Sequence, residues 1–154
     1  LSLLSGRNPH YLIGEQVISA PIIKDLGLEP IPTGYILLDG GAVTSVEFMS
    51  GTRPIPMEKK DIVASHALAG QYLGMKSIYL EAGSGAKNHV TEEIIEFVSN
   101  FISIPIIVGG GISSPEIASK LVKVGASILV IGTAIEKELD SMFDFAKAIH
   151  WKDK

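Results

Sequence analysis

One carboxylate, Glu81, stands where an apolar run meets a glycine-rich turn in the stretch IYLEAGSGAKN, residues 78–88. Residues 77–80 read as a short buried strand, and the following GSG reads as the loop that leaves it. A charge at such a point is costly if it is buried without a partner, so it is either solvated or used in chemistry. Because strand side chains alternate, Tyr79 and Glu81 are expected to point to the same side of the sheet.

Two further apolar runs end in glycine turns of the same kind. Gly109-Gly110-Gly111 precedes a helix that opens at Ser114, and Gly132-Thr133 leads almost directly into the last helix. Backbone amides at such turns attract anions, and glycine lets a phosphate group approach the backbone closely. Either turn alone could be a simple tight turn. Taken together they favour a phosphate site, and that neighbourhood favours a functional role for Glu81 over a solvated one.

Composition and sequence motifs exclude several other kinds of protein. There are no cysteines, so disulfide and thiolate chemistry are excluded. The net charge of −4, without a long basic run, argues against nucleic-acid binding. No dinucleotide-binding fingerprint, P-loop or metal-type histidine pair is present. No apolar run approaches the length of about 18 residues that a membrane span needs, and we expect a cytoplasmic protein.

The elements that must position these residues alternate between apolar strands and amphipathic helices. The apolar runs predict strands at residues 1–4, 35–38 and 77–80 and in the segments IPIIVGGGI and SILVIGT. Helical spacing predicts a helix at about 10–26, which Pro21 should kink or split, and a last helix at about 134–149. Capping residues predict one helix that begins at Asp61 and another that begins at Thr91. A further helix is predicted from Ser114 to Gly125. Residues 44–56 alternate enough for a short extra strand, but Pro54 and Pro56 end it, so a long loop is predicted.

Alternating strands and helices predict an α/β fold with a parallel sheet covered by helices. The segments LGMKSIYLEAG and VGASILVIG repeat one order of helix-ending glycine, apolar strand and glycine turn. Such a repeat favours a TIM (β/α)8 barrel over a doubly wound sheet, in a single domain of residues 1–154. A full barrel takes about 250 residues, with a lower bound near 200. With only about five strands, either the sheet is open or three βα units precede Leu1.

Three motifs resemble one known family. YLEAGSGA at 79–86, IVGGGI at 107–112 and IGTAIEK at 131–137 are similar to geranylgeranylglyceryl phosphate synthase and its bacterial heptaprenylglyceryl phosphate relatives. The segments SGRNPHYLIGEQVISAP, IPTGYILLDGG and PIPMEKKDIVASHALAGQYLGMKSIYLEAGSG extend the likeness over essentially the whole chain, and its details are closer to the longer-chain subgroup. The motif around Glu81 is highly specific, whereas GGG turns occur in many phosphate-binding barrels.

The resemblance implies a prenyltransferase that joins a long-chain prenyl diphosphate to sn-glycerol 1-phosphate. The product would carry the first ether bond of archaeal-type membrane lipids, and geranylgeranyl diphosphate is the expected donor. The resemblance also implies that the glycerol phosphate is held by Tyr79, Leu80, Glu81, Ala82, Gly83, Ser84 and Gly85, with its phosphate on Gly110, Gly111, Gly132 and Thr133. Glu81 is our candidate catalytic base, since an alcohol must lose its proton as the ether bond forms.

The resemblance further implies a Mg²⁺ cofactor whose ligands are not in this sequence. The family carries a metal-binding aspartate and a lysine near the glycerol phosphate on its first strand, and a hydroxyl ligand for the metal on its second. This chain resembles the family from the fourth strand onward. We therefore expect the C-terminal part of the barrel, about strands 4–8, with the first three βα units missing and no metal ligand to assign. A homo-oligomer and a transient membrane contact through the lipid product are also expected.

The prenyl chain needs an apolar groove. One wall is predicted on the first helix at Tyr11, Leu12, Ile13, Val17 and Ile18, although core packing would explain these residues equally well. Two other functions stay open at this point. The chain could belong to another phosphate-binding TIM-barrel isomerase or synthase, or it could be an inactive half-barrel fragment.

Overall fold

The computed structural model describes residues 1–150 and contains one sheet of five parallel strands in the order β1-β2-β3-β4-β5. The strands are β1 (Ser2–Leu3), β2 (Thr33–Leu37), β3 (Ser77–Glu81), β4 (Ile106–Gly109) and β5 (Ile128–Val130). Each crossover moves one place in the same direction, which is the winding of a β/α barrel wall and not of a doubly wound sheet. The predicted α/β parallel fold is confirmed. Residues 151–154 of the predicted domain lie outside the described residues.

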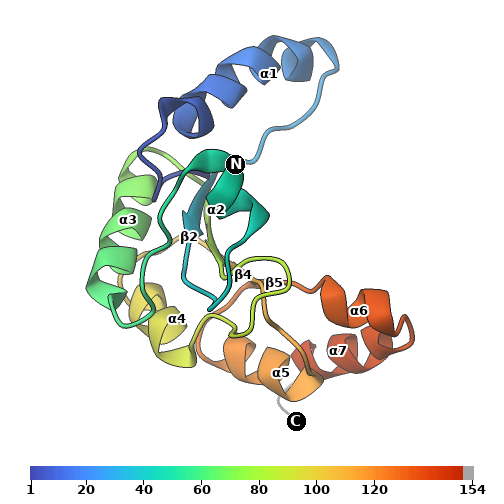
Figure 1. The fold of residues 1–154 in the computed structure, drawn as a ribbon. Coiled ribbons are helices and arrows are strands. Elements are labelled where there is room, and N and C mark those ends of the chain that lie inside the picture. The colour runs from blue at the N-terminus through green and yellow to red at the C-terminus, as the bar shows by residue number, and fades with distance from the viewer. Residues whose placement is uncertain (151–154) are drawn as a thin grey trace.

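Helices follow the strands in turn. They are η1 (His10–Gly14), α1 (Glu15–Asp25), α2 (Ser45–Ser50), α3 (Lys60–Tyr72), α4 (Glu92–Ser99), α5 (Pro115–Lys123), α6 (Thr133–Lys137) and α7 (Ser141–Ile149). Helices α3, α4 and α5 pack along one side of the sheet, whereas α1 extends away from it (Figure 1).

The main core lies between the sheet and these packed helices. Leu80 of β3 and Val108 of β4 are fully buried against α3 and α4 residues such as Ala67 and Ile95. Full burial of one such aliphatic side chain contributes about 1.5–3 kcal/mol. Because neighbouring strand residues point to opposite faces, this packing turns Tyr79 and Glu81 to the other face of β3.

Two predicted helix caps are confirmed. The Thr91 hydroxyl accepts the Ile94 amide hydrogen, and the Ser114 hydroxyl accepts that of Ile117, with Pro115 at the first helical position. The predicted cap at Asp61 is wrong. Helix α3 begins at Lys60, so Asp61 lies in its first turn, where a carboxylate favours the helix dipole.

The predicted loop at residues 44–56 is wrong in its first half, which forms α2. The Thr44 hydroxyl accepts the Glu47 amide hydrogen, and Gly51 ends the helix at φ 63°. A Thr-x-x-Glu start and a left-handed glycine stop were therefore readable in the sequence.

Two other predicted helices have different boundaries. Pro21 lies inside α1 and does not divide it, because losing one amide donor leaves the neighbouring helical bonds in place. The last helix is interrupted between Lys137 and Ser141, giving α6 and α7. The interruption has a packing cause: α7 turns onto α5 and buries Phe145, whereas α6 stays at the end of β5.

Candidate active site

The carboxyl ends of four strands meet in register at one edge of the sheet. Leu37 pairs with Glu81, Glu81 with Gly109, and Gly109 with Val130. The loops that follow these residues therefore surround a common space, which is a cavity of about 500 Å³. Ligands of parallel α/β proteins bind at this edge.

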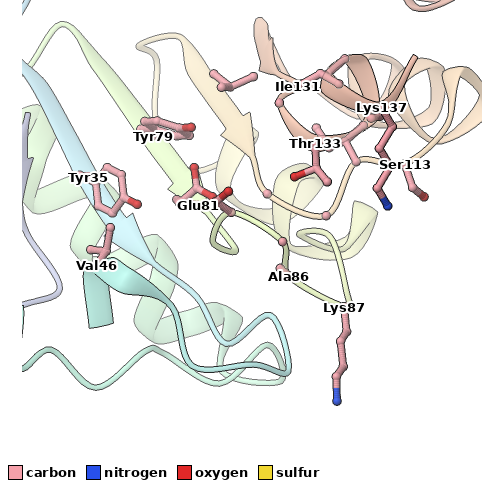
Figure 2. A pocket seen from close by; sticks show the side chains of 18 residues that line it. Tyr35, Val46, Tyr79, Glu81, Ala86, Lys87, Ser113, Ile131, Thr133 and Lys137 are labelled. Carbon is pink, nitrogen blue, oxygen red and sulfur yellow. The ribbon is translucent and has the colours of Figure 1, made fainter. Parts of the chain in front are cut away.

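Glu81 lies at the floor of this polar cavity and is only 8% exposed. Its Oε1 accepts a hydrogen bond from the Gly83 amide at 2.6 Å, and the Tyr79 hydroxyl donates to the same carboxylate. Two hydrogen-bond donors offset part of the cost of burying this carboxylate. The glycine after the strand thus fixes the acid in one orientation, facing the cavity (Figure 2).

Tyr35 and Tyr79 stand side by side on neighbouring strands, paired in register. Their rings meet edge to face with centroids 5.1 Å apart. Burial, followed by the nearby Glu81 carboxylate, raises the pKa of Tyr35 above its ordinary value. Burial also raises the pKa of Tyr79, and the hydrogen bond to Glu81 raises it further. Both phenols are therefore neutral hydrogen-bond donors at neutral pH.

These shifts predict a loss of stability in alkali. A tyrosine has a pKa of about 10 in the unfolded chain, and the folded protein holds both protons more tightly. Their contribution is complete below pH about 10 and is lost as the pH rises from there toward the folded pKa values. We expect the free energy of unfolding to fall less steeply with pH above 10 in the Tyr35→Phe, Tyr79→Phe double variant. Urea titrations at a series of pH values measure this slope.

Tyr72 supplies the matched control, because its side chain is 78% exposed. Tyr72→Phe should keep the wild-type pH dependence. An unchanged slope in the double variant would contradict the prediction.

A second, apolar cavity of about 360 Å³ adjoins the first. Tyr35 and Val46 line both cavities, so the polar and apolar spaces meet at these two side chains. The remaining lining residues come from the N-terminal segment with β1, from η1 and the start of α1, and from α2: Leu1, Leu3, Tyr11, Glu15, Ser45, Met49 and Ser50.

The predicted groove wall is largely wrong. Tyr11 lines the apolar cavity, but Leu12, Ile13, Val17 and Ile18 do not. These four are exposed, with Val17 at 64%, and α1 buries no residue. The reason is the direction of α1, which leads away from the sheet.

Most residues predicted for the site come together around the polar cavity. Those that line it are Tyr79, Glu81, Ser84, Gly85, Gly110, Gly111, Gly132 and Thr133. Leu80, Ala82 and Gly83 do not line it. Leu80 and Ala82 are fully buried in the core, and the Gly83 amide is engaged by Glu81. These three can therefore act only through the backbone or by positioning Glu81.

Several lining residues were not predicted. Tyr35 could have been found, because it occupies on its strand the position that Tyr79 occupies on the next. Lys137 could have been suspected from its place one helical turn after Thr133. Val46 could have been predicted as a lining residue only if α2 had been recognised as a helix. The other unpredicted lining residues are Ala86, Lys87, Ile112, Ser113, Val130, Ile131 and Ala134.

Within residues 1–150, no group of three His, Cys, Asp or Glu side chains could hold a metal ion. Glu81 is the one acidic residue that lines the polar cavity, and its oxygens already accept from Gly83 and Tyr79. No helix in that range has the length and apolar character needed to cross a bilayer.

The winding of the sheet and the position of the site are those of proteins of the β/α-barrel type. Residues 1–150 match the PcrB family, and the chain belongs to that family. Geranylgeranylglyceryl phosphate synthase of Chitinophaga pinensis is 52% identical over 150 residues, which are 97% of this chain and 60% of that protein. The Pyrococcus horikoshii enzyme of the same name is 51% identical, covering 89% of this chain and 53% of its own length.

A solved structure is similar over the same range. It is (S)-3-O-geranylgeranylglyceryl phosphate synthase from Thermoplasma acidophilum in complex with the substrate sn-glycerol-1-phosphate. It superimposes with a TM-score of 0.90 and 35% identity, covering 96% of this chain and 60% of that one. The chain thus spans 53–60% of the length of these relatives.

Proposed function

We propose that the protein transfers a long-chain prenyl group from its diphosphate to sn-glycerol 1-phosphate. Geranylgeranyl diphosphate is the expected donor. The product carries the first ether bond of archaeal-type membrane lipids. One observation carries this proposal: the fixed carboxylate of Glu81 and three glycine-rich turns line one cavity, and Tyr35 and Val46 of that cavity also line an apolar one. The similar T. acidophilum structure, named as a complex with sn-glycerol-1-phosphate, supports the same acceptor.

The polar cavity suits glycerol phosphate because its two ends differ. Gly110, Gly111, Gly132 and Thr133 offer backbone amides without bulky side chains to the phosphate. Glu81 lies between Gly110 and the aromatic pair, and the glycerol hydroxyls would be placed on its aromatic side. A carboxylate accepts hydrogen bonds from hydroxyls and repels phosphate, so it fixes the orientation of the acceptor.

The reaction places one proton on Glu81. An oxygen–carbon bond forms between the glycerol hydroxyl and the first prenyl carbon, and the bond from that carbon to the diphosphate breaks. The diphosphate leaves with the electron pair, and the hydroxyl proton passes to the Glu81 carboxylate. Such a base contributes about 10²–10⁴-fold to the rate.

The apolar cavity is the proposed entry to the prenyl groove. Its lining of Leu1, Leu3, Tyr11 and Met49 is almost free of polar surface. Since Tyr35 and Val46 line both cavities, the reacting carbon would lie beside them. This placement replaces the wall on α1 that the sequence predicted.

Mg²⁺ remains part of the proposal and would offset the charge of the diphosphate. We propose that its ligands belong to the part of the relatives' length that this chain does not span. We also propose a homo-oligomer, since Val17, Ile18, Ile22 and Leu26 expose apolar side chains along α1. A cytoplasmic location and a transient membrane contact through the product stay predictions.

The acceptor can be tested by thermal unfolding of the full-length protein. sn-Glycerol 1-phosphate at 100 times its Kd is expected to raise the Tm by about 5–10 °C. The sn-3 enantiomer should raise it by less than half as much, because inversion at its central carbon prevents both hydroxyls from taking the same positions beside Glu81 while its phosphate occupies the turns. Transfer of radiolabelled geranylgeranyl diphosphate onto the 1-phosphate then measures the activity.

Equal shifts from both enantiomers would point instead to a general phosphate-binding barrel, the isomerase or synthase alternative. A shift with the 1-phosphate but no transfer by the full-length protein with Mg²⁺ would support a binding-only protein. Either result would contradict the proposed activity.

A further inference from the structure

Thr44, the residue before α2, lines neither cavity but contacts the elements that line both. Its side chain is buried, and its two γ substituents meet different elements. The hydroxyl accepts the Glu47 amide hydrogen at 3.1 Å, and the methyl packs against Gly83. We propose that Thr44 is a positioning residue for prenyl transfer, whose methyl fixes the Glu81 carboxylate and whose hydroxyl fixes the donor side. The inference rests on the proposed function.

The methyl group reaches the turn that orients Glu81. Gly83 has a φ of +103°, and a Cβ atom built at this position would overlap the Thr44 methyl carbon. The methyl therefore occupies the space that a side chain of residue 83 would take. It supports the Gly83 amide nitrogen, which lies 2.6 Å from Oε1 of Glu81. Without the methyl, the turn could relax into the vacated space and move the carboxylate with it.

The hydroxyl group holds α2, a helix that depends on its caps. Of its six residues, Ser45–Ser50, Ser50 alone is buried. A helix this short is not stable by propensity, so the N-terminal cap decides whether its first turn forms. The helix contributes Val46 to both cavities and Met49 to the apolar one. Loss of the cap should therefore disturb the proposed prenyl groove and leave the turn at Gly83 supported.

Two substitutions separate these roles. Thr44→Ser keeps the hydroxyl and removes the methyl, whereas Thr44→Val keeps the methyl and removes the hydroxyl. The extended backbone of Thr44, with φ −104° and ψ 161°, accepts a β-branched side chain such as valine. Thr91→Ser is the matched control, because Thr91 caps α4 in the same way but is exposed and lines neither cavity.

The experiment is steady-state prenyl transfer by the full-length protein with Mg²⁺, geranylgeranyl diphosphate and sn-glycerol 1-phosphate. We expect Thr44→Ser to lower the turnover number by about three- to thirtyfold, less than the roughly 10²-fold that a misplacement of about 1 Å can cost. Its Michaelis constants should stay within about threefold of wild type. Thr44→Val should keep turnover within about twofold and raise the Michaelis constant of the prenyl donor by about three- to tenfold.

The division between the two variants is what a purely structural role would not produce. Such a role would lower the Tm of both variants and affect their kinetics alike. Thr91→Ser should keep wild-type kinetics, since the capping hydroxyl is retained. Wild-type turnover in Thr44→Ser, or equal kinetic losses in Thr44→Ser and Thr44→Val, would overturn the inference and leave the acceptor site standing. Melting curves check that each variant folds.

The Gly83 amide proton gives a readout that does not depend on activity. A short hydrogen bond to a carboxylate is strong and moves such a proton to low field in NMR spectra. We expect the Gly83 signal to move to higher field in Thr44→Ser and to stay in place in Thr44→Val. If the wild-type protein transferred no prenyl group, the proposed function would fail, and this signal alone would decide the contact. An unchanged signal in Thr44→Ser would overturn it.

Discussion

Replacing Glu81 by Gln is expected to lower the turnover number of the full-length protein by about 10²–10⁴-fold. The Michaelis constant for glycerol phosphate should change by only about threefold, because the phosphate turns still hold the acceptor. The amide has the shape of the carboxylate, and its oxygen can still accept the hydrogen bond from the Gly83 amide. What it cannot do is take the hydroxyl proton. The measurement is steady-state prenyl transfer with saturating donor.

Glu96→Gln is the matched control, since it removes one carboxylate charge from the exposed side of α4. It should leave turnover unchanged. A Glu81→Gln enzyme with turnover within about threefold of wild type would remove Glu81 as the base, because a general base contributes far more than that. A large rise in the Michaelis constant at unchanged turnover would assign Glu81 to substrate binding alone.

The part of the site that the sequence predicts is the part that local signals determine. An apolar run followed by Gly-Ser-Gly specifies where β3 ends, and strand alternation specifies that Tyr79 and Glu81 share a face. The observed pocket contains both residues together with the turns after β4 and β5. No tertiary information was needed, because parallel strands bring their carboxyl ends to one edge.

The errors arise where tertiary packing decides. Helical periodicity identified the apolar side chains of α1 but not the direction of that helix, so Val17 and Ile18 were assigned to a groove that they do not line. The interruption between α6 and α7 depends on Phe145 reaching α5, which no local pattern encodes. Lys137 lines the polar cavity from the last position of α6.

The error at α2 is of another kind. Thr44 and Glu47 form a helix-capping pattern that is present in the sequence. The whole segment was nevertheless predicted to be a loop, because Pro54 and Pro56 follow. The consequence is functional, because α2 contributes Val46 and Met49 to the apolar cavity. The arrangement of that cavity was therefore the largest part of the site that the sequence did not predict.

Gly110→Ala is expected to destabilise the protein by about 2–5 kcal/mol, the sum of backbone strain and steric overlap. Gly110 has a φ of +83°, a conformation that L side chains rarely adopt. A Cβ atom at this position would lie 2.5 Å from the Gly83 amide nitrogen and 2.6 Å from Oε1 of Glu81. The methyl group would thus press on the hydrogen bond that orients the carboxylate. Urea unfolding and titration with glycerol phosphate measure the two effects.

Gly74 separates strain from overlap, because it has a φ of +88° and no heavy atom within 4 Å of the place that a Cβ atom would take. Gly74→Ala should therefore cost only the strain, about 1–2 kcal/mol, and keep wild-type ligand affinity. Equal losses of stability in the two variants would show that the β3 and β4 turns are not in contact at Gly110. A larger loss in Gly110→Ala, accompanied by weaker binding, would show that one contact both holds the turns together and fixes the acid.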